Sequence, residues 1–430
     1  MGDEKSTNGK IIYAYLGLPG AESWLRAHGL EKQVISEQRL RLAVGNPQLL
    51  LNEEGQLTTS VNPSIVPLVD RILAELLRKR FDSAETVILA VNLLSKSRLH
   101  LFRRLLADAW GYKVVFVNAM DLPIKPADAI AMGYDDGVRQ RWSRYLARYT
   151  AVDWSTMGTV IGLDKFLQDL QQPLQFRKVS ATTKRLVVFS DVHGDADNLQ
   201  SRLSKLASSQ TEVVFLGDAI DRGRDSAGVI RTLQAYNTGL HLLGNHEHRL
   251  LTWYLEHRLS RSATKDFGQV TLPQLERAHV SQDEIHQFIN GLGTYLALKF
   301  AGRKFLFSHA GLEPTQVMSW LKPKTLTESI ALAPADVFIH GLSVAGKSVY
   351  SRDIDKVWAD AKAVRDIISV HGHRNRFDRD VVTNQGMSFN LTDADGSSFR
   401  YLVLTAEDRR FALHIDQRNG EQKRVITGVF

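Results

Sequence analysis

Over the first 170 residues, short continuous apolar runs alternate with longer segments in which apolar residues recur every three or four positions. Short β-branched or apolar runs typical of strands occur at 10–16, 34–35, 86–91 and 114–117. Between them, segments 65–79 and 95–109 carry apolar residues at three- and four-residue spacing, which is the period of an amphipathic helix. Strands that alternate with helices predict a parallel sheet covered by helices, so we expect an α/β domain over residues 1–170.

The pattern changes after a polar, basic stretch at 171–184, which contains Pro173 and is typical of a linker. Strand-like runs at 185–190, 212–216 and 239–243 each end in a cluster of Asp, Asn, His and Gly. Open α/β sheets place their active sites at the carboxyl ends of strands. A polar helical stretch at 262–290 predicts a cap or insertion. Strands are then expected at 304–307, 367–370, 400–404 and 411–415. These elements predict a second α/β domain over 185–430.

The length and composition of the chain limit the kinds of site and partner that it can have. A chain of 430 residues exceeds what one core usually serves, which agrees with two domains. There are no cysteines, so disulfides, thiolate ligands and cysteine nucleophiles are excluded, and a metal would need His, Asp, Glu or Asn. The net charge of +7 favours a polyanionic partner such as nucleic acid, but it is equally typical of an ordinary solvated surface.

The sequence does not predict a membrane partner. No apolar stretch approaches the ~18–20 residues that span a bilayer. The first ten residues are polar and lack the apolar region of a signal peptide. Residues 1–6 match the short myristoylation pattern, but this pattern is common by chance and no polybasic segment follows. We therefore expect a cytoplasmic protein.

Five short polar signatures follow one another along the second domain. They are Asp191-Val192-His193-Gly194, Gly217-Asp218-Ala219-Ile220-Asp221-Arg222-Gly223, Gly244-Asn245-His246-Glu247, Ser308-His309-Ala310-Gly311 and His371-Gly372-His373. Each is weak alone, because a single Asp-x-His is usually a surface turn and a single buried His is usually part of a core. Five in order, each after a strand-like run, are hard to obtain by chance.

The signatures supply oxygen and imidazole ligands. The candidate ligands are Asp191, His193, Asp218, Asn245, His309 and His373. Carboxylates combined with imidazoles suit first-row transition metals better than Ca²⁺ or Mg²⁺. Six ligands exceed what one catalytic ion needs, whereas two ions that share a bridging carboxylate would use them all. We expect two divalent ions, with Mn²⁺ first and Fe, Zn or Ni as alternatives.

The order and spacing of the signatures resemble the calcineurin-like metallophosphoesterases. The resemblance is strongest to the branch shared by Ser/Thr protein phosphatases, diadenosine tetraphosphate hydrolases and bacterial polynucleotide phosphatases, and it covers about 190–405. It implies a β-sandwich flanked by helices, with a dimetal site at one edge. It also implies a ligand assignment. Asp191 and His193 bind the first metal, Asp218 bridges, and Asn245, His309 and His373 bind the second.

The family often adds a late aspartate after an Asn-Ile pair. Here Asn390 and Leu391 are followed by Thr392 and only then by Asp393, which leaves the role of Asp393 open.

Four further residues are candidates for catalysis around such a centre. Two adjacent metals, ~3.5–4 Å apart, acidify a shared water and hold the entering and leaving oxygens of an in-line displacement. Arg222 is placed to bind phosphoryl oxygens in a bidentate manner, although a surface salt bridge is the simpler alternative. His246 is the expected proton donor to the leaving oxygen and Asp221 its orienting partner. Arg352, in a segment resembling the arginine-bearing loop of many relatives, is a second phosphate-binding candidate or an ordinary exposed arginine.

Residues 341–348 match the phosphate-loop pattern G-x-x-x-x-G-K-S. A phosphate loop requires a strand before it and a long helix after it. The sequence that follows is typical of a loop, and the pattern lies between two metal signatures. We therefore do not expect nucleotide binding there.

The first domain resembles the kinase domain of polynucleotide kinase–phosphatases, with most of its catalytic residues replaced. The family's phosphate loop follows its first strand as G-x-P-G-S-G-K-S, but here Glu22, Ser23 and Trp24 occupy the last three positions. The S-x-D-x-x-R motif is present at 36–41 with Gln38 in place of the base. The V-V-D-A-T-N-L strand is present at 87–93 with Leu89 in place of its Asp. The alternative is an unrelated α/β domain.

Together these patterns predict a dimetal phosphoesterase acting on nucleic-acid ends or nucleotides, with a kinase-like domain that does not transfer phosphate. A Ser/Thr protein phosphatase and a dinucleoside polyphosphate hydrolase share the same signatures and remain alternatives. A non-catalytic nucleic-acid-binding scaffold is a third, although it would not need a full set of metal ligands. The sequence does not predict an oligomeric state.

Overall fold

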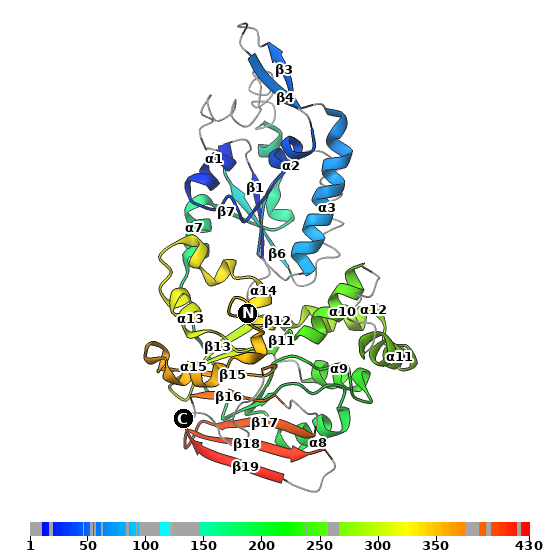
Figure 1. Cartoon of the computed structure of the whole chain (residues 1–430), viewed down its shortest axis with the longest axis vertical. Helices are drawn as coiled ribbons and strands as arrows, with labels where there is room; N and C mark the ends of the chain where they lie inside the picture. Colours follow the sequence, from blue (N-terminus) through cyan, green and yellow to red (C-terminus); the bar gives the residue numbers. More distant parts are fainter. Residues whose placement is uncertain are drawn as a thin grey trace. The chain divides into compact units, whose positions relative to one another are not determined.

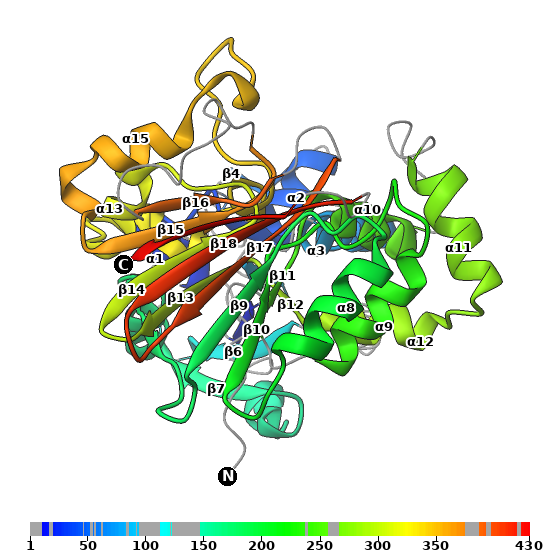
Figure 2. The same cartoon turned by 90° about the horizontal axis from the view of Figure 1, so that it is seen from below.

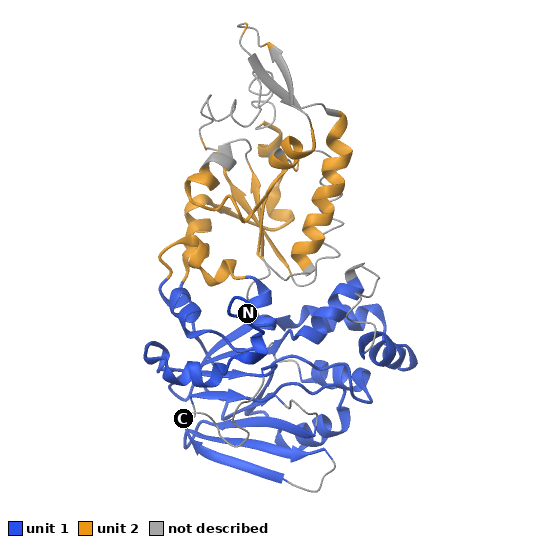
Figure 3. Ribbon diagram, in the orientation of Figure 1, with its two compact units in different colours: residues 1–8, 173–322, 334–430 blue, residues 9–172, 323–333 orange. Residues whose placement is uncertain are grey.

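The computed structural model describes most of the chain. The described residues are 11–16, 20–45, 47–51, 55, 57–61, 63–82, 86–91, 93, 112–120, 122, 147–236, 240–256, 266–374, 387–392, 397–418 and 423–430. They form two compact units, shown in Figure 3 in different colours. Unit 1 contains 173–322 and 334–430, and unit 2 contains the described residues up to Gln172 together with 323–333.

Unit 2 is built on a sheet of five parallel strands in the order β2-β5-β1-β6-β7. The strands are β1 (Ile11–Leu16), β2 (Val34–Ser36), β5 (Val87–Ala90), β6 (Lys113–Asn118) and β7 (Thr159–Gly162). The helices are α1 (Gly20–Ala27), α2 (Glu37–Val44), α3 (Val66–Asp82) and α7 (Leu163–Gln171). A hairpin of β3 (Pro47–Leu51) and β4 (Leu57–Val61) is also present. The predicted parallel α/β domain is confirmed; the helix expected at 95–109 lies outside the described residues.

Both faces of the unit 2 sheet are covered by apolar side chains. On one face Leu77 and Phe81 of α3 pack against residues of β1 and β5. On the other, Leu25 of α1 and Phe166 of α7 pack against Tyr13 of β1, and Leu326 belongs to the same cluster. Leu326 lies in 323–333, a segment that forms two short 3₁₀ turns, Leu326–Glu328 and Ile330–Leu332. A piece of chain from the middle of the second sequence domain therefore completes the core of unit 2.

Unit 1 contains two packed sheets. The first has the order β12-β11-β10-β9-β17-β18-β19 and the second β16-β15-β14-β13-β8. The strands of the first are β9 (Arg185–Phe189), β10 (Thr211–Phe215), β11 (His241–Leu242), β12 (Leu292–Gly293), β17 (Ser398–Thr405), β18 (Arg410–Gln417) and β19 (Lys423–Val429). Those of the second are β8 (Arg177–Lys178), β13 (Tyr295–Phe300), β14 (Arg303–Ser308), β15 (Ile367–His371) and β16 (Ser388–Asn390).

Alternate residues of most of these strands face a shared core. Leu186 and Val188 of β9, Phe305 and Phe307 of β14, and Leu402 of β17 all belong to one buried cluster. This two-residue period is what a strand requires when its two faces are covered differently. The outer faces are covered by helices, with α8 and α9 beside one sheet and α13 and α15 beside the other (Figure 2).

The helices of unit 1 include the expected cap. They are α8 (Ala196–Leu206), α9 (Ser226–Ala235), α10 (Asn245–Glu256), α11 (Leu272–Arg277), α12 (Gln282–Asn290), α13 (Pro314–Leu321), α14 (Ala335–Ile339) and α15 (Ile354–Asp360). A π-helical segment, Phe267–Thr271, leads directly into α11. Among the helices described, none is both long and apolar enough to cross a membrane.

The segment expected as a linker contributes to unit 1. Arg177–Lys178 forms β8, which pairs in parallel with β13, and the Leu174 N–H donates to the Trp320 carbonyl at 2.8 Å. A two-residue edge strand has too few positions to produce a periodic pattern, so the sequence does not indicate it.

The topology brings the five signatures to the ends of strands. In the first sheet β9, β10 and β11 run parallel, and their signatures begin within two residues of each strand's last residue. In the second sheet β14 and β15 are parallel and end in the two remaining histidine signatures. Figure 1 shows β13, β15 and β16 of this sheet. The site therefore lies where loops from both sheets of unit 1 converge.

Candidate metal centre

The backbone of the signature loops takes up an uncommon conformation. Non-glycine residues with a left-handed φ between 49° and 72° include Asp191, His193, Asp218, Asp221, Arg222 and His373. Such conformations cost of order 1–3 kcal/mol each and persist where the surroundings impose them, which is frequent at functional sites. Among the described residues, three other non-glycine positions have positive φ, and none of those belongs to a signature.

Two glycines allow the loops to approach closely. A Cβ added to Gly217, which has a φ of 106°, would lie 2.6 Å from the Gly244 Cα. A Cβ added to Gly372 would lie 2.1 Å from the Asp191 Oδ2. Both distances are shorter than any real contact, so a side chain at either position would push one ligand-bearing loop away from another.

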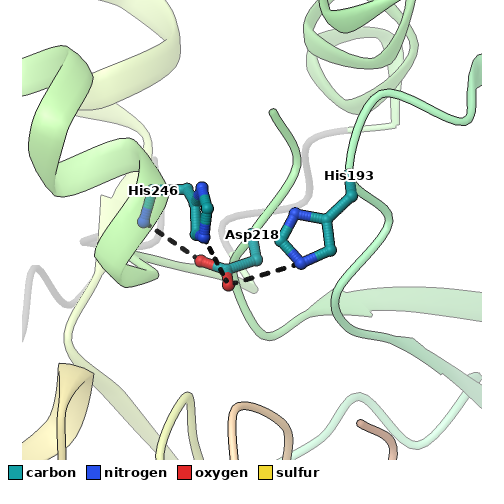
Figure 4. A group of neighbouring side chains, drawn as sticks. All are labelled: His193, Asp218 and His246. Carbon is teal, nitrogen blue, oxygen red and sulfur yellow. Dashed lines mark hydrogen bonds and ion pairs between the residues drawn. The ribbon is translucent and has the colours of Figure 1, made fainter. Parts of the chain in front are cut away.

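Asp218 lies at the centre of the site. Its Oδ2 is 3.7 Å from the Nε2 atoms of both His193 and His246, which approach it from two sides (Figure 4). Its Oδ1 is 3.3 Å from the Nε2 of His309. Two groups of possible metal ligands result, namely His193, Asp218 and His246, and Asp218, His309 and His373. Asp218 is common to both groups, which is the geometry of a bridging carboxylate.

Backbone carbonyls fix two of the imidazoles. The Nδ1 of His193 is 3.1 Å from the Ile220 carbonyl, and that of His309 is 2.9 Å from the Leu216 carbonyl. Because a carbonyl only accepts, each Nδ1 carries a hydrogen, so in the neutral form that binds a metal each ring would present its Nε2 lone pair on the side of Asp218. This is the arrangement by which proteins orient metal-binding histidines.

The amide of Asn245 adds another oxygen or nitrogen at the same point. Its atom facing the site lies 3.0 Å from the Nε2 of His309, 3.0 Å from the Nδ1 of His373, and 3.2 and 3.3 Å from the Asp218 carboxylate oxygens. With the amide oxygen in that position, all of its neighbours are acceptors. A divalent cation would satisfy this convergence of lone pairs, so the residues fit a metal.

Asp191 lies beside these groups rather than within them. Its Oδ2 accepts from the Ser190 hydroxyl at 2.6 Å, and the N–H of His373 lies 3.3 and 3.4 Å from its two carboxylate oxygens. Its charge affects the pKa values of both His193 and His309. The predicted ligand Asp191 is therefore at the site and already linked to the loop of His373.

The electrostatics of the site favour a cation. Burial opposes ionisation of Asp218, but His246 and His309 outweigh it and hold the pKa of this carboxyl well below its usual value. Burial likewise opposes protonation of His309, yet Asp218 raises its pKa to about 9. Burial, with a smaller effect of the charged His309, holds the pKa of His373 well below its usual range, so its ring is neutral and able to ligate.

Glu247 is a residue of the site that sequence reasoning did not identify. Its side chain is fully buried and accepts from the backbone N–H groups of Asp218 and Ala219 at 2.7 Å and of Gly244 at 3.0 Å. Burial, and then the charge of Asp218, raise its pKa to about 7. It joins two signature loops through their backbones. Its place in the third signature was visible, but its long-range partners were not.

His246 and Asp221 form the expected pair. The His246 Nδ1 lies 2.6 Å from the Asp221 Oδ2, and the hydroxyl of Thr271 donates to the other carboxylate oxygen. Burial lowers the pKa of His246, but Asp218 and Asp221 raise it by more, and the net shift is upward. Thr271 comes from the π-helical turn of the predicted cap, so the cap supplies a residue that fixes Asp221. Such turns are frequent at functional sites.

The two candidate phosphate-binding arginines differ. Arg222 is exposed, and its charge lowers the pKa of His193, which places it at the rim of the site. Arg352 instead forms a two-point ion pair with Glu313, with Nε 3.0 Å from Oε1 and Nη2 donating to Oε2 at 3.1 Å. Asp393 lies outside the described residues.

Comparison with known proteins agrees with this geometry. The family model "Calcineurin-like phosphoesterase" matches residues 184–399. No curated protein sequence matches the chain significantly.

Three solved structures illustrate the similarity. A "putative diadenosine tetraphosphatase" is 18% identical, with a TM-score of 0.36, and the match covers 59% of this chain and 97% of that one. A metallophosphoesterase from Sphaerobacter thermophilus is 14% identical (TM-score 0.34; 55% and 89% covered). A protein serine/threonine phosphatase from Saccharomyces cerevisiae is 12% identical (TM-score 0.34; 67% and 96% covered). Because the family model spans half of the chain and includes all five signatures, this protein belongs to the calcineurin-like phosphoesterases, a family of metal-dependent hydrolases.

Proposed function

We propose that this protein hydrolyses phosphate esters of nucleic-acid ends or nucleotides at a centre of two transition-metal ions, with Mn²⁺ as the expected metal. The observation that carries the proposal is the position of Asp218, whose carboxylate lies between two groups of histidines. Asp191, His193 and Asp218 would hold one ion, and Asp218, Asn245, His309 and His373 the other. The ions would supply Lewis acidity and an activated water.

The residues around the centre position the substrate and move a proton. Arg222, exposed at the rim, binds the non-bridging phosphoryl oxygens. His246 holds a proton for the leaving oxygen, and Asp221 stabilises the charged ring through the 2.6 Å contact with its Nδ1. The upward shift of the His246 pKa favours this protonated form. The other ring nitrogen of His246, Nε2, lies 3.7 Å from the Asp218 carboxylate, and His246 belongs to one of the two groups of possible metal ligands. A test of the proton-donor role must therefore distinguish it from metal binding.

Two features support a nucleic-acid or nucleotide substrate. The net charge of +7 attracts polyanions, and the α/β domain that precedes the phosphoesterase domain resembles the kinase domain of polynucleotide kinase–phosphatases in its sequence. We propose that this first domain does not transfer phosphate and instead binds nucleic acid or braces the enzyme. Trp24 stands where a working phosphate loop needs a hydroxyl. Its ring lies against His28, with centroids 4.0 Å apart, and near Tyr15 and Phe166 in an aromatic cluster.

A hydrolysis panel with Mn²⁺ tests the substrate class. It compares RNA with 3′-phosphate or 2′,3′-cyclic phosphate ends, dinucleoside polyphosphates and phosphopeptides, at two salt concentrations. We expect the RNA ends to be the best substrates and their binding to weaken as salt rises, through counterion release. If phosphopeptides are better at both salt concentrations, a Ser/Thr protein phosphatase replaces the present proposal. If dinucleoside polyphosphates are better, a dinucleoside polyphosphate hydrolase does.

A further inference from the structure

The loop of residues 341–352 joins α14 to α15 in unit 1 and is described throughout. It contains the G-x-x-x-x-G-K-S pattern, but a short helix precedes it and a single 3₁₀ turn, Val349–Ser351, ends it. The strand and long helix that a phosphate loop requires do not flank it. Its tip is exposed, with Leu342 at 39% and Val344 at 44% exposure. Residues 341–348 therefore do not form a phosphate loop.

One contact joins this loop to a predicted metal ligand. The hydroxyl of Tyr350 lies 2.9 Å from the Nε2 of His373, and the two ring centroids are 5.3 Å apart. The opposite ring nitrogen of His373, Nδ1, lies 3.0 Å from the amide of Asn245 and belongs to the group formed with Asp218 and His309. If Nδ1 presents its lone pair to a metal, the neutral ring carries its hydrogen on Nε2. That N–H then donates to the oxygen of Tyr350.

His373 differs in this respect from His193 and His309. Those two rings are oriented through Nδ1 by the backbone carbonyls of Ile220 and Leu216, which are fully buried residues. His373 is oriented through Nε2 by a side chain on an exposed loop. Tyr350 itself is 41% exposed. One ligand of the second metal thus depends on a segment at the surface, whereas the other two histidines depend on the core.

Further contacts hold the base of the loop in place. Arg352 makes its two-point ion pair with Glu313, which is only four residues beyond the ligand His309. At the other end, Gly341 has a φ of 78°, and a Cβ added there would lie 2.5 Å from the Nη1 of Arg374. Arg374 directly follows the ligand His373. The loop is therefore joined by an ion pair to the segment that carries His309, and it lies closely against the residue that follows His373.

We propose that Tyr350 is a positioning residue for the second metal ion, and that loop 341–352 holds it in place. The hydroxyl fixes the rotation of the His373 ring so that Nδ1 points toward Asp218. This inference rests on the proposed dimetal centre. It implies that the affinity for the second ion depends on the loop, while the affinity for the first, held by Asp191, His193 and Asp218, does not.

The test is a Mn²⁺ binding isotherm of the metal-free full-length protein, measured by titration calorimetry. Tyr350→Phe keeps the ring and removes the hydroxyl. We expect one of the two Mn²⁺ sites to weaken ~10–100-fold, the usual cost of losing a group that orients a ligand, while the other stays unchanged. Tyr236→Phe is the matched control. It removes the hydroxyl of a tyrosine at the end of α9, outside the loop and outside the five signatures, and both sites should remain as in the parent.

A second readout is the electron paramagnetic resonance spectrum at a Mn²⁺ concentration that saturates the parent. A coupled pair is expected for the parent and for Tyr236→Phe, and isolated Mn²⁺ for Tyr350→Phe, with the pair restored by excess Mn²⁺. The variant His373→Ala distinguishes the positioning role of Tyr350 from the ligand role of His373. If His373→Ala loses a site but Tyr350→Phe binds both ions like the parent, Tyr350 is not a positioning residue. If His373→Ala also binds both ions like the parent, the proposed ligand set fails and the inference with it.

Discussion

The two units both contain parallel strands followed by polar sequence motifs, but the motif residues have different partners. In unit 1 the side chains of Asp218, His309 and His373 converge within 4.8 Å of one another. In unit 2 Ser36 caps α2 by accepting from the Arg39 N–H, and Arg41 pairs with Glu37 at 2.8 Å. These two motif residues of unit 2 thus stabilise a helix, whereas the three of unit 1 face one another. A catalytic site requires side chains that meet at one point, and a fold with similar loops can exist without such a site.

The largest effect should come from removing the shared carboxylate. Asp218→Asn is expected to lower hydrolysis of an aryl phosphate by at least about 10³-fold, because a bridging ligand supports several kcal/mol of transition-state stabilisation. The measurement is Mn²⁺-dependent turnover together with bound metal. Asp366→Asn, on an exposed carboxylate paired with Lys304, is the control and should leave turnover unchanged. Full activity of Asp218→Asn with normal metal content would rule out the convergence as the active site.

Next in size is the effect of His246→Ala, which tests whether His246 donates a proton. Turnover of alkyl phosphates should fall ~10²–10⁴-fold, because a poor leaving group needs a proton. Nitrophenyl phosphate, whose leaving group needs little help, should be affected much less. Steady-state kinetics on both esters provide the measurement. An equal loss on both would contradict the role and would favour His246 as a metal ligand.

A smaller effect is expected from Glu247→Gln, which tests how the convergence is held. The carboxylate accepts from three backbone N–H groups, and an amide would turn a donor toward at least one of them. An unsatisfied buried donor costs about 1–3 kcal/mol, so the free energy of unfolding of unit 1 should fall by that amount. Urea unfolding gives the value. Glu276→Gln, on an exposed glutamate of α11, should change it by less than about 0.5 kcal/mol. Equal values for the two variants would show that Glu247 does not brace the loops.

The last prediction is that unit 2 has no measurable kinase activity. Unit 2 should not transfer the γ-phosphate of ATP to 5′-hydroxyl DNA or RNA, because Ser23 replaces the Lys of a phosphate loop and Trp24 replaces its metal-binding hydroxyl. Labelled ATP and the Asp218→Asn variant, which cannot remove a new label, provide the assay. Clear 5′ labelling would show that unit 2 is catalytic as well, and that the two units do not differ in this respect.

The sequence predicts those parts of the molecule that depend on short spacings. The strands before each signature are confirmed because each is a short, continuous apolar run, which is typical of a strand buried on both faces. The polar residues after them could be grouped because parallel strands end at one edge. Thr271, Tyr350 and Glu313 could not be assigned to the site in this way. Each acts on a residue far away in the chain, and nothing in its own neighbourhood indicates the partner.

Segment 323–333 also affects how the protein is made. A ribosome completes residue 172 while the apolar face that Leu326 will cover still lacks that side chain. Leu326 follows roughly 150 residues later. At 5–20 residues per second the delay is about 8–30 s. During that interval the nascent N-terminal unit presents an incomplete core, which is a natural binding site for a chaperone and a reason for a truncated chain ending at residue 172 to aggregate.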